Sequence, residues 1–438
     1  MKLITVNNKQ NRILFSAYNK DFPEGPPARA IISAGAFKAE VQTGLDDDIA
    51  PGHIGIPKGL FPFTLPEQIE YRMKTQGRVI MLGPVIAYIP FDKSVPLNTR
   101  TLNRIIPYFF HYTEVGGLIY VCNSRSFDFD SQTVDGYAYI PGATPFECKW
   151  QHGRYPLPAS MYKRVDVGED TYNKLLAYMG DAIFNSYFFD KYELYQYMSN
   201  YPGLREHLPE TKALESAADL VDFLSRYNAV YLKPMFSSKS RGIVTVHKAG
   251  GDKCVFLQKG KKDKEYTADE FEDAIKDIMA ADQYLIQQGI EIDEYAGRRY
   301  DFRVIMQKDE SRRWGCTGII TRFGKVNAPV TNFMQAGFAK PGDEGLKLGF
   351  SATAKEAFVI KQDMIKVCGD VCRRLDETSG NYGDVGVDVV VDKDRRVWIL
   401  EINKLHDHKF PLYAIKDEQM YYNVITHPFR YAKALAGF

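Results

Sequence analysis

The sequence predicts an α/β protein, and three observations support this fold class. Residues 79–123 read as a strand, a helix and a second strand, the order that builds a parallel sheet. Residues 218–248 read as a short amphipathic helix followed by two strands. Near the end of the chain, residues 384–403 show two runs of alternating apolar residues around a polar turn, the pattern of an antiparallel hairpin.

The composition sets bounds on domain number and on partners. A chain of 438 residues is too long for one small core, and we expect two to four subdomains. With 56 Lys and Arg residues against 55 Asp and Glu residues, the formal charge is only +1, so no overall basic field attracts nucleic acid or an acidic membrane. No run reaches the roughly 18 apolar residues of a membrane span. We therefore expect a cytoplasmic protein. Its six cysteines lack CxxC spacing, and the two that are close in sequence, Cys368 and Cys372, are expected to be free thiols on a helix.

The N-terminal part begins with a stretch that is rich in short alternating runs and in turn residues, which predicts a β-rich, loop-heavy opening over about the first 80 residues. Residues 79–90 predict a buried strand that is interrupted at Gly83 and Pro84. Residues 97–117 predict a helix that ends at glycines. The aromatic stretch 137–162 is rich in proline and glycine, and we interpret it as a structured connection.

The middle of the chain changes to a helical pattern. A helix with Lys191 is predicted over 188–200, and a strand with Lys233 over 229–234. The loop 235–242 follows, and a small-residue loop of this kind can bring backbone N–H groups and serine hydroxyls close to a phosphate. The loop has a single glycine, so a plain β-hairpin turn is the simpler explanation. The serines concerned are Ser237, Ser238 and Ser240.

The third part of the chain alternates strands with one long helix. Thr267 and Glu270 have the spacing of a capping box that opens a helix at about 268. A helix is also predicted over 354–375. The strands are predicted at 284–292, at 300–307 with Arg303, and at 314–324 with Arg322.

The predicted hairpin carries a candidate metal site. Glu401 and Asn403 are two residues apart on one strand, so both side chains point to one face of the sheet. A turn of even length would bring Asp388 to that same face. Magnesium prefers oxygen ligands and would suit this trio. The alternative is that the three residues are simply the solvated face of a hairpin.

The order and spacing of several motifs resemble the ATP-grasp superfamily over about 250 residues. These motifs are DKYELY, YLKP, the serine loop, LIQQGI, YDFRV, IITRF, TNFMQAG, GVDVV and LEIN. The N-terminal segments MLGPVIAYIP and PLPASMYKR extend the similarity to the YheC/YheD-like, endospore coat-associated family. The resemblance implies an N-terminal α/β pre-ATP-grasp domain over 1–180. It further implies an α+β central lid over about 181–290 and a C-terminal metal-binding subdomain over 291–438.

The resemblance also implies roles for individual residues. Its cofactors are ATP and Mg²⁺, with Mn²⁺ as a substitute. The lysines could instead be surface residues, and Asp301 and Arg303 could be a structural ion pair without a ligand. The implied roles are phosphate contacts for Lys191, Lys233, Ser238 and Asn332, the adenine edge for Gln288 and Gly289, a nucleotide contact for Asp301, the transferring phosphoryl and the carboxyl group for Arg303 and Arg322, and metal ligation for Asp388, Glu401 and Asn403.

The activity implied by the resemblance is ATP-dependent ligation of a carboxylate to an amine through an acyl phosphate, with peptides or amino acids as substrates. A spore coat-associated structural or binding protein with little or no turnover is the alternative, which the bulky serine loop favours. A phosphotransferase that stops at phosphorylation is a third reading. His406 and His408 are acceptor-site groups, or a base on the amine side, or a satisfied or solvent-exposed pair; the last of these is the simpler explanation.

Overall fold

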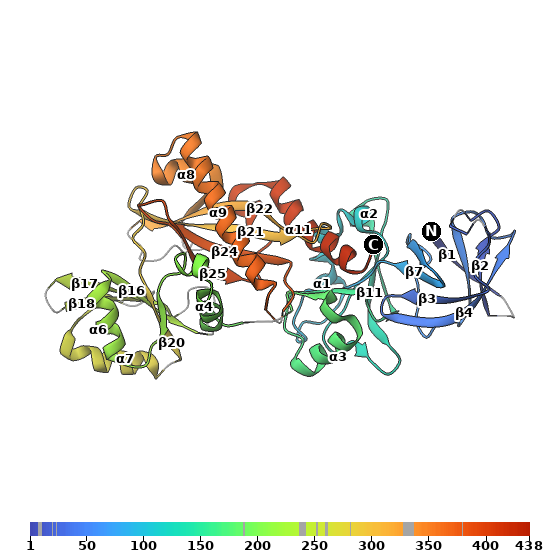
Figure 1. Ribbon diagram of the computed structural model, residues 1–438, viewed down its shortest axis with the longest axis horizontal. Coiled ribbons are helices and arrows are strands. Elements are labelled where there is room, and N and C mark those ends of the chain that lie inside the picture. Colours follow the sequence, from blue (N-terminus) through green and yellow to red (C-terminus); the bar gives the residue numbers. More distant parts are fainter. Residues whose placement is uncertain are drawn as a thin grey trace.

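The computed structural model shows an elongated molecule whose described residues form four β-sheets (Figure 1). The sheet formed by the first 83 residues lies at one end of the molecule. The sheet formed by strands between residues 211 and 288 lies at the other end, together with two helices. Among the described residues, no helix has the length and apolar character needed to cross a bilayer. The structure describes residues 1–438 except 8–10, 20, 23, 187–188, 236–241, 251–252, 259–261, 281, 327–336 and 379.

The first sheet confirms the predicted β-rich opening. Its strand order is β1-β5-β2-β4-β3-β7-β6, and its apolar faces form a core with the neighbouring second sheet. The strands are β1 (Lys2–Val6), β2 (Arg12–Ser16), β3 (Arg29–Ala34), β4 (Phe37–Asp46), β5 (His53–Pro57), β6 (Arg72–Gln76) and β7 (Val79–Gly83).

The second sheet contains the predicted parallel strands and two departures from prediction. β8 (Val85–Ile89) runs parallel to β9 (Leu118–Val121), as the strand-helix-strand order predicted. The single helix predicted over 97–117 is wrong: three short helices stand there, because Pro107 in the middle one lacks an N–H group and cannot continue a helix. The connection predicted over 137–162 is also wrong, because this region forms most of three strands. The elements are α1 (Thr99–Asn103), η1 (Ile106–Phe109), α2 (Tyr112–Val115), β10 (Phe127–Asp128), β11 (Thr133–Ile140), η2 (Pro145–Glu147), β12 (Lys149–Pro156), β13 (Ser160–Lys163), α3 (Glu169–Met179), η3 (Gly180–Ala182) and β14 (Ile183–Phe184).

The third sheet is antiparallel, with the order β15-β20-β16-β17-β18-β19. One face is covered by α6 and α7, whose apolar residues form a core with Val230, Leu232 and Ile286 of the strands. The opposite face therefore carries the odd-numbered residues of β16 and β20. The elements are α4 (Lys191–Ser199), α5 (Pro202–Arg205), β15 (Thr211–Ala213), α6 (Ala217–Arg226), β16 (Ala229–Pro234), β17 (Val244–Gly250), β18 (Lys253–Gln258), β19 (Lys264–Thr267), η4 (Ala268–Glu270), α7 (Phe271–Met279) and β20 (Tyr284–Gln288).

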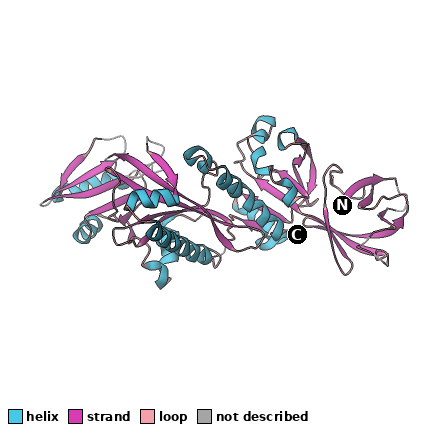
Figure 2. Cartoon of the chain, turned by 90° about the horizontal axis from the view of Figure 1, so that it is seen from above, coloured by secondary structure: helices cyan, strands magenta, loops and turns pink. Residues whose placement is uncertain are grey.

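The fourth sheet has the order β23-β22-β21-β24-β25 and packs against helices on both faces. The predicted helix over 354–375 is confirmed as α9 (Ala354–Leu375). α11 (Glu418–Leu435) packs against both this sheet and the second sheet, and Figure 2 shows the helices lying against the sheets along the molecule. The other elements are β21 (Arg298–Lys308), β22 (Trp314–Val326), β23 (Phe338–Pro341), α8 (Gly342–Phe350), β24 (Asp384–Val391), β25 (Val397–Asn403) and α10 (Phe410–Ile415).

The predicted hairpin is confirmed as β24 and β25, but its register arises differently from the prediction. The turn 392–396 has an odd number of residues, which by itself would pair Asp388 with Leu400. A β-bulge at Leu400 shifts the pairing by one residue, so Asp388 lies opposite Glu401. The even-length turn is therefore wrong, and the bulge brings the two carboxylates to one face.

Candidate active site

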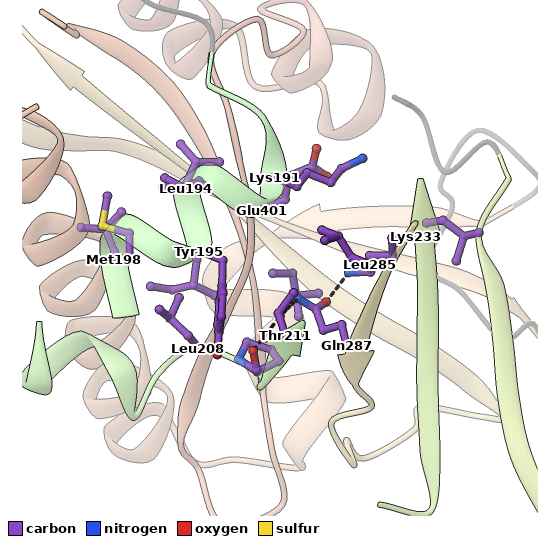
Figure 3. Close-up of a pocket in the computed structure, with 16 residues that line it drawn as sticks. Lys191, Leu194, Tyr195, Met198, Leu208, Thr211, Lys233, Leu285, Gln287 and Glu401 are labelled. Atoms are coloured by element: carbon purple, nitrogen blue, oxygen red, sulfur yellow. Dashed lines mark hydrogen bonds between the residues drawn. The ribbon is translucent and has the colours of Figure 1, made fainter. Parts of the chain in front are cut away.

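A cleft lies between α4, the open face of the third sheet and β25 (Figure 3). One end is polar, with two lysines and a glutamate, and the other end is apolar. This division suits a ligand with an anionic end and a flat, apolar end. The lining residues are Lys191, Leu194, Tyr195, Met198, Leu208, Pro209, Thr211, Lys233, Ile243, Leu285, Gln287, Val371, Ile399, Leu400, Glu401 and Ile402.

The two predicted phosphate lysines lie on different elements of this cleft. Lys191 is the first residue of α4, where the Asp190 carboxylate caps the helix, and its Nζ donates to the Pro234 carbonyl at 3.2 Å. Lys233 is half-buried on β16, and its Nζ donates to the Gln287 side chain. The pKa of Lys233 is lowered to about 8, chiefly by burial; Glu401 acts to raise this pKa, and Lys191 acts to lower it. The cleft thus gathers positive charge at one end.

The residues expected at the adenine edge lie beside the cleft. The backbone N–H of Gln288 donates to the Glu210 carbonyl at 2.8 Å, and that of Gly289 donates to the Ala229 carbonyl at 2.9 Å. Among the described residues, Gln287 lines the cleft, and Gln288 and Gly289 do not. Sequence reasoning missed Gln287, although strand alternation with Leu285 would have placed both on one face.

Next to the cleft, four charged residues form a buried network on the fourth sheet. Asp301 and Arg322 lie opposite each other on β21 and β22, and the guanidinium donates to both carboxylate oxygens at 2.6 and 2.8 Å. Arg303 and Asp388 lie opposite each other on β21 and β24 and form a second bidentate pair. The Asp301–Arg303 pair considered from the sequence is therefore wrong, because residues directly across a ladder are closer than residues two apart on one strand.

Asp388 is the most heavily bonded member of this network. Arg303 donates to both of its oxygens, Arg322 lies 3.2 Å from Oδ2, and the Asn403 amide donates to Oδ2 at 3.1 Å. Burial raises the pKa of Asp388, but the two guanidinium groups outweigh this effect and lower it to about 2. Asp388 is thus an ionised carboxylate whose oxygens are all occupied by donors.

The predicted metal trio lies on one face, as expected. Glu401 is opposite Asp388, and the Asn403 amide reaches Asp388. No described residue donates a hydrogen bond to the Glu401 carboxylate, which lines the cleft. Two carboxylates and an amide are a donor set that fits Mg²⁺, which takes oxygen ligands. A cation on Asp388 would have to replace an arginine.

The remaining predicted residues lie outside the described part of the chain. Ser238, with its neighbours in the serine loop, falls in 236–241, and Asn332 falls in 327–336. Their contacts with phosphate stay predictions.

His406 and His408 form a buried pair on Asp384, so the solvent-exposed alternative considered from the sequence is wrong, and among the described residues His406 Nδ1 has no hydrogen-bond partner. The Nε2–H of each ring donates to one oxygen of the ionised Asp384 carboxylate at 2.8 Å, and Tyr162 of the second sheet donates to the same carboxylate at 2.6 Å. Burial lowers the pKa of His408 to about 3, and Arg164 adds to this effect. Neither histidine lines the cleft. The cluster joins the second and fourth sheets.

The comparisons with known proteins agree with this architecture. A model of the YheC/D-like ATP-grasp family matches residues 180–435, more than half of the chain. The chain belongs to this YheC/YheD-like ATP-grasp family. Its fold is accordingly the ATP-grasp fold, as the motif order implied, preceded by the two N-terminal sheets.

Two curated members of the family come from Bacillus subtilis (strain 168). The endospore coat-associated protein YheD is 23% identical over 77% of this chain and 76% of its own length. The endospore coat-associated protein YheC is 24% identical over 62% of this chain and 77% of its own length.

Solved structures with the ATP-grasp fold are also similar to this chain. The ATP-grasp ligase PsnB, complexed with precursor peptide PsnA2 and AMPPNP, is 11% identical with a TM-score of 0.45 and covers 81% of this chain and 99% of its own. The D-cycloserine synthetase DcsG is 14% identical with a TM-score of 0.42 and covers 80% and 99%, respectively.

Proposed function

We propose that this protein is an ATP-dependent carboxylate–amine ligase that forms an amide or peptide bond on a peptide or amino-acid substrate. The observation that supports the proposal most strongly is the cleft in which Lys191, Lys233 and Glu401 meet at one end. An apolar end for a base and a cationic end for phosphates are what a nucleotide requires. Family membership supports the same ligand.

The chemistry needs positioning and charge neutralisation more than a protein nucleophile. A carboxylate does not react with an amine directly, because its oxygen is a poor leaving group. Transfer of the γ-phosphoryl group of ATP gives an acyl phosphate, and cations around the transferring group favour this step. Lys191 and Lys233 would bind the phosphates, and Arg303 and Arg322 would face the phosphoryl group and the carboxyl group. Asp301 would orient Arg322 through its bidentate pair.

The metal would be held by Asp388, Glu401 and Asn403. Bound Mg²⁺, or Mn²⁺ in its place, supplies positive charge to the phosphate oxygens. For Asp388 to bind the metal, Arg303 would have to release its carboxylate. The guanidinium group of Arg303 would then be available to an anionic substrate. Release of a bidentate arginine is favourable only when another anion replaces the carboxylate, so nucleotide and metal would bind together.

The second half of the reaction is attack of the amine on the acyl phosphate with departure of phosphate. The oxyanion that forms would again face an arginine. Water must be excluded, because it would hydrolyse the acyl phosphate. We propose that residues 181–290, which include Ser238 and the adenine-edge residues Gln288 and Gly289, close over residues 291–438, which include Asn332. Residues 1–180 would then contribute to substrate binding.

Mass spectrometry tests this proposal directly. The protein is incubated with candidate peptides, Mg-ATP and an amino-acid pool, while ADP and phosphate are measured. A peptide mass gain equal to one residue, with ADP release that depends on the acceptor, is the expected result. Glu401→Gln should abolish both signals, and the exposed control Glu272→Gln should abolish neither.

The other outcomes separate the alternative functions. A stable phosphorylated product without an amide would indicate a phosphotransferase. Nucleotide binding without release of ADP would indicate a spore coat-associated binding protein, a role that the names of both curated relatives support.

A further inference from the structure

A row of hydrogen bonds crosses three adjacent strands at the polar wall of the cleft (Figure 3). Thr211 of β15 lies directly opposite Gln287 of β20, and Gln287 lies opposite Tyr231 of β16. Lys233 is two residues beyond Tyr231, so it is the diagonal neighbour of Gln287 on the same face. All three linked side chains, those of Thr211, Gln287 and Lys233, therefore point into the cleft, away from the core under α6 and α7.

The hydrogen bonds determine how the Gln287 amide is oriented. The Thr211 hydroxyl donates to the Pro209 carbonyl at 2.9 Å, so its oxygen is left as an acceptor. The Gln287 Nε2 donates to that oxygen at 2.9 Å, and its Oε1 accepts from Lys233 Nζ. A flipped amide would place its NH₂ against the ammonium group and its oxygen against the Thr211 oxygen, two repulsive contacts.

Lys233 donates to a neutral amide, so the positive charge of its ammonium group is not neutralised by this partner. Among the described residues, no carboxylate forms an ion pair with Lys233, and the side chain that accepts from its Nζ is the Gln287 amide. The charged groups that influence it are Lys191 on α4, Glu401 on β25 and Asp388 on β24. An amide restrains the position of the ammonium group but leaves its positive charge available to an anion, whereas a carboxylate would compete with that anion.

We propose that Gln287 is the positioning residue of this site. Thr211 fixes the amide of Gln287, and the amide oxygen directs the Lys233 ammonium group at the triphosphate of a bound Mg-nucleotide without neutralising it. This inference rests on the proposed function, since it assumes that the anion at the polar end is the nucleotide phosphate. It predicts that the hydroxyl of Thr211, two hydrogen bonds away from Lys233, contributes to nucleotide affinity.

Calorimetric titration with Mg²⁺ and a non-hydrolysable ATP analogue tests the inference on the full chain. Thr211→Val keeps the side-chain shape but removes both hydrogen bonds of the hydroxyl, and it should weaken binding roughly threefold to tenfold, the effect of about one hydrogen bond. Thr211→Ser keeps the hydroxyl and should bind as the wild type does. The control is Ser225→Ala on α6, which removes an exposed hydroxyl that lies outside the cleft and donates to the Asp222 carbonyl.

The pH dependence of binding separates positioning from a merely structural role. Wild-type affinity should fall as the pH rises through about 8, because Lys233 loses its proton there. Gln287→Glu would pair with Lys233, so it should weaken binding at pH 7 roughly tenfold and move the alkaline fall to higher pH. Thermal unfolding of each variant shows whether it is folded.

The outcomes are distinguishable. Failure of the wild type to bind the Mg-nucleotide would overturn the proposed function and, with it, the inference. Wild-type affinity in Thr211→Val and an unshifted pH profile in Gln287→Glu, with binding still lost in Lys233→Met, would overturn the inference alone. If Gln287→Glu does not fold, the nucleotide affinities of Thr211→Val and Thr211→Ser are compared, and equal affinities overturn the inference.

Discussion

Replacement of Asp388 by asparagine removes the charge that holds two arginines in the fourth sheet. Arg322 keeps Asp301 as a partner, but Arg303 loses the carboxylate to which it donates two bonds. The side chains of Arg303 and Asp388 are only 12% and 11% exposed, so water cannot replace the lost partner. We therefore expect Asp388→Asn to destabilise the protein much more than loss of a surface ion pair would.

Two estimates of the magnitude agree. A pKa of about 2 for Asp388, against about 3.9 in an unfolded chain, corresponds to about 2 to 3 kcal/mol of stability. Removing one partner of a buried pair costs about 3 to 5 kcal/mol. About 3 kcal/mol would lower the melting temperature of a domain of this size by roughly 6 to 12 °C. Because the folded pKa is depressed, this stabilisation is present above about pH 4 and is lost as the pH falls through about 2.

Thermal unfolding followed by circular dichroism at pH 7 measures this loss. The matched control is Asp170→Asn in the Lys174–Asp170 pair, whose side chains are 54% and 81% exposed, respectively, and whose loss should change stability by about 0 to 1 kcal/mol. The double variant Arg303→Met, Asp388→Asn should recover part of the loss, because no unpaired arginine remains. A melting temperature of Asp388→Asn equal to that of Asp170→Asn would refute the reasoning.

Three further predictions follow from the same structure. Arg303→Met removes two donors from Asp388, so it should raise the affinity for Mn²⁺ without nucleotide roughly tenfold, measured by electron paramagnetic resonance; unchanged affinity would mean that the arginine does not compete with the metal. In the folded protein, His408 stays neutral down to about pH 3, whereas in the unfolded chain its imidazole is protonated below about pH 6.5, so acid favours unfolding. His408→Gln removes this group and should therefore reduce the loss of folding stability in acid. Stability of the wild type should fall by up to about 1.4 kcal/mol per pH unit between pH 6 and 4, and the exposed control His152→Gln should follow the wild type in urea titrations. Lys191→Met should weaken binding of the nucleotide analogue without changing the melting temperature, and retained affinity would remove Lys191 from the site.

Elements with a strong period were predictable from the sequence. The helix over 354–375 and the two strands of the hairpin were found because apolar residues recur at one spacing over the whole element. The strands within residues 137–162 were not predicted, because the prolines and glycines of this stretch are typical of a connection. Strands β11 and β12 form because they pair with each other, and this pairing is not visible in the local sequence. A single helix over 97–117 was predicted because the helical sequence pattern continues on both sides of Pro107, and the helix-breaking effect of this proline was not taken into account.

The candidate site depended more on cross-strand register, which the sequence does not show. Asp388 and Glu401 were assigned to one face, but the feature that puts them there is the bulge at Leu400. The partners of Asp301 and Arg303 were missed because ion pairing in a sheet follows the residue opposite, which depends on register. Gln287 was missed for a different reason, since its alternation with Leu285 along β20 was visible in the sequence and would have placed it on the cleft face.

The most direct measurement is a crystal structure of the protein with Mg²⁺ and a non-hydrolysable ATP analogue. We predict that the triphosphate contacts Lys191 and Lys233, that the metal lies on Glu401 and Asp388, and that Arg303 has left Asp388. A nucleotide bound elsewhere, or one bound in the cleft with the Arg303–Asp388 pair intact and no metal on Glu401, would contradict the account.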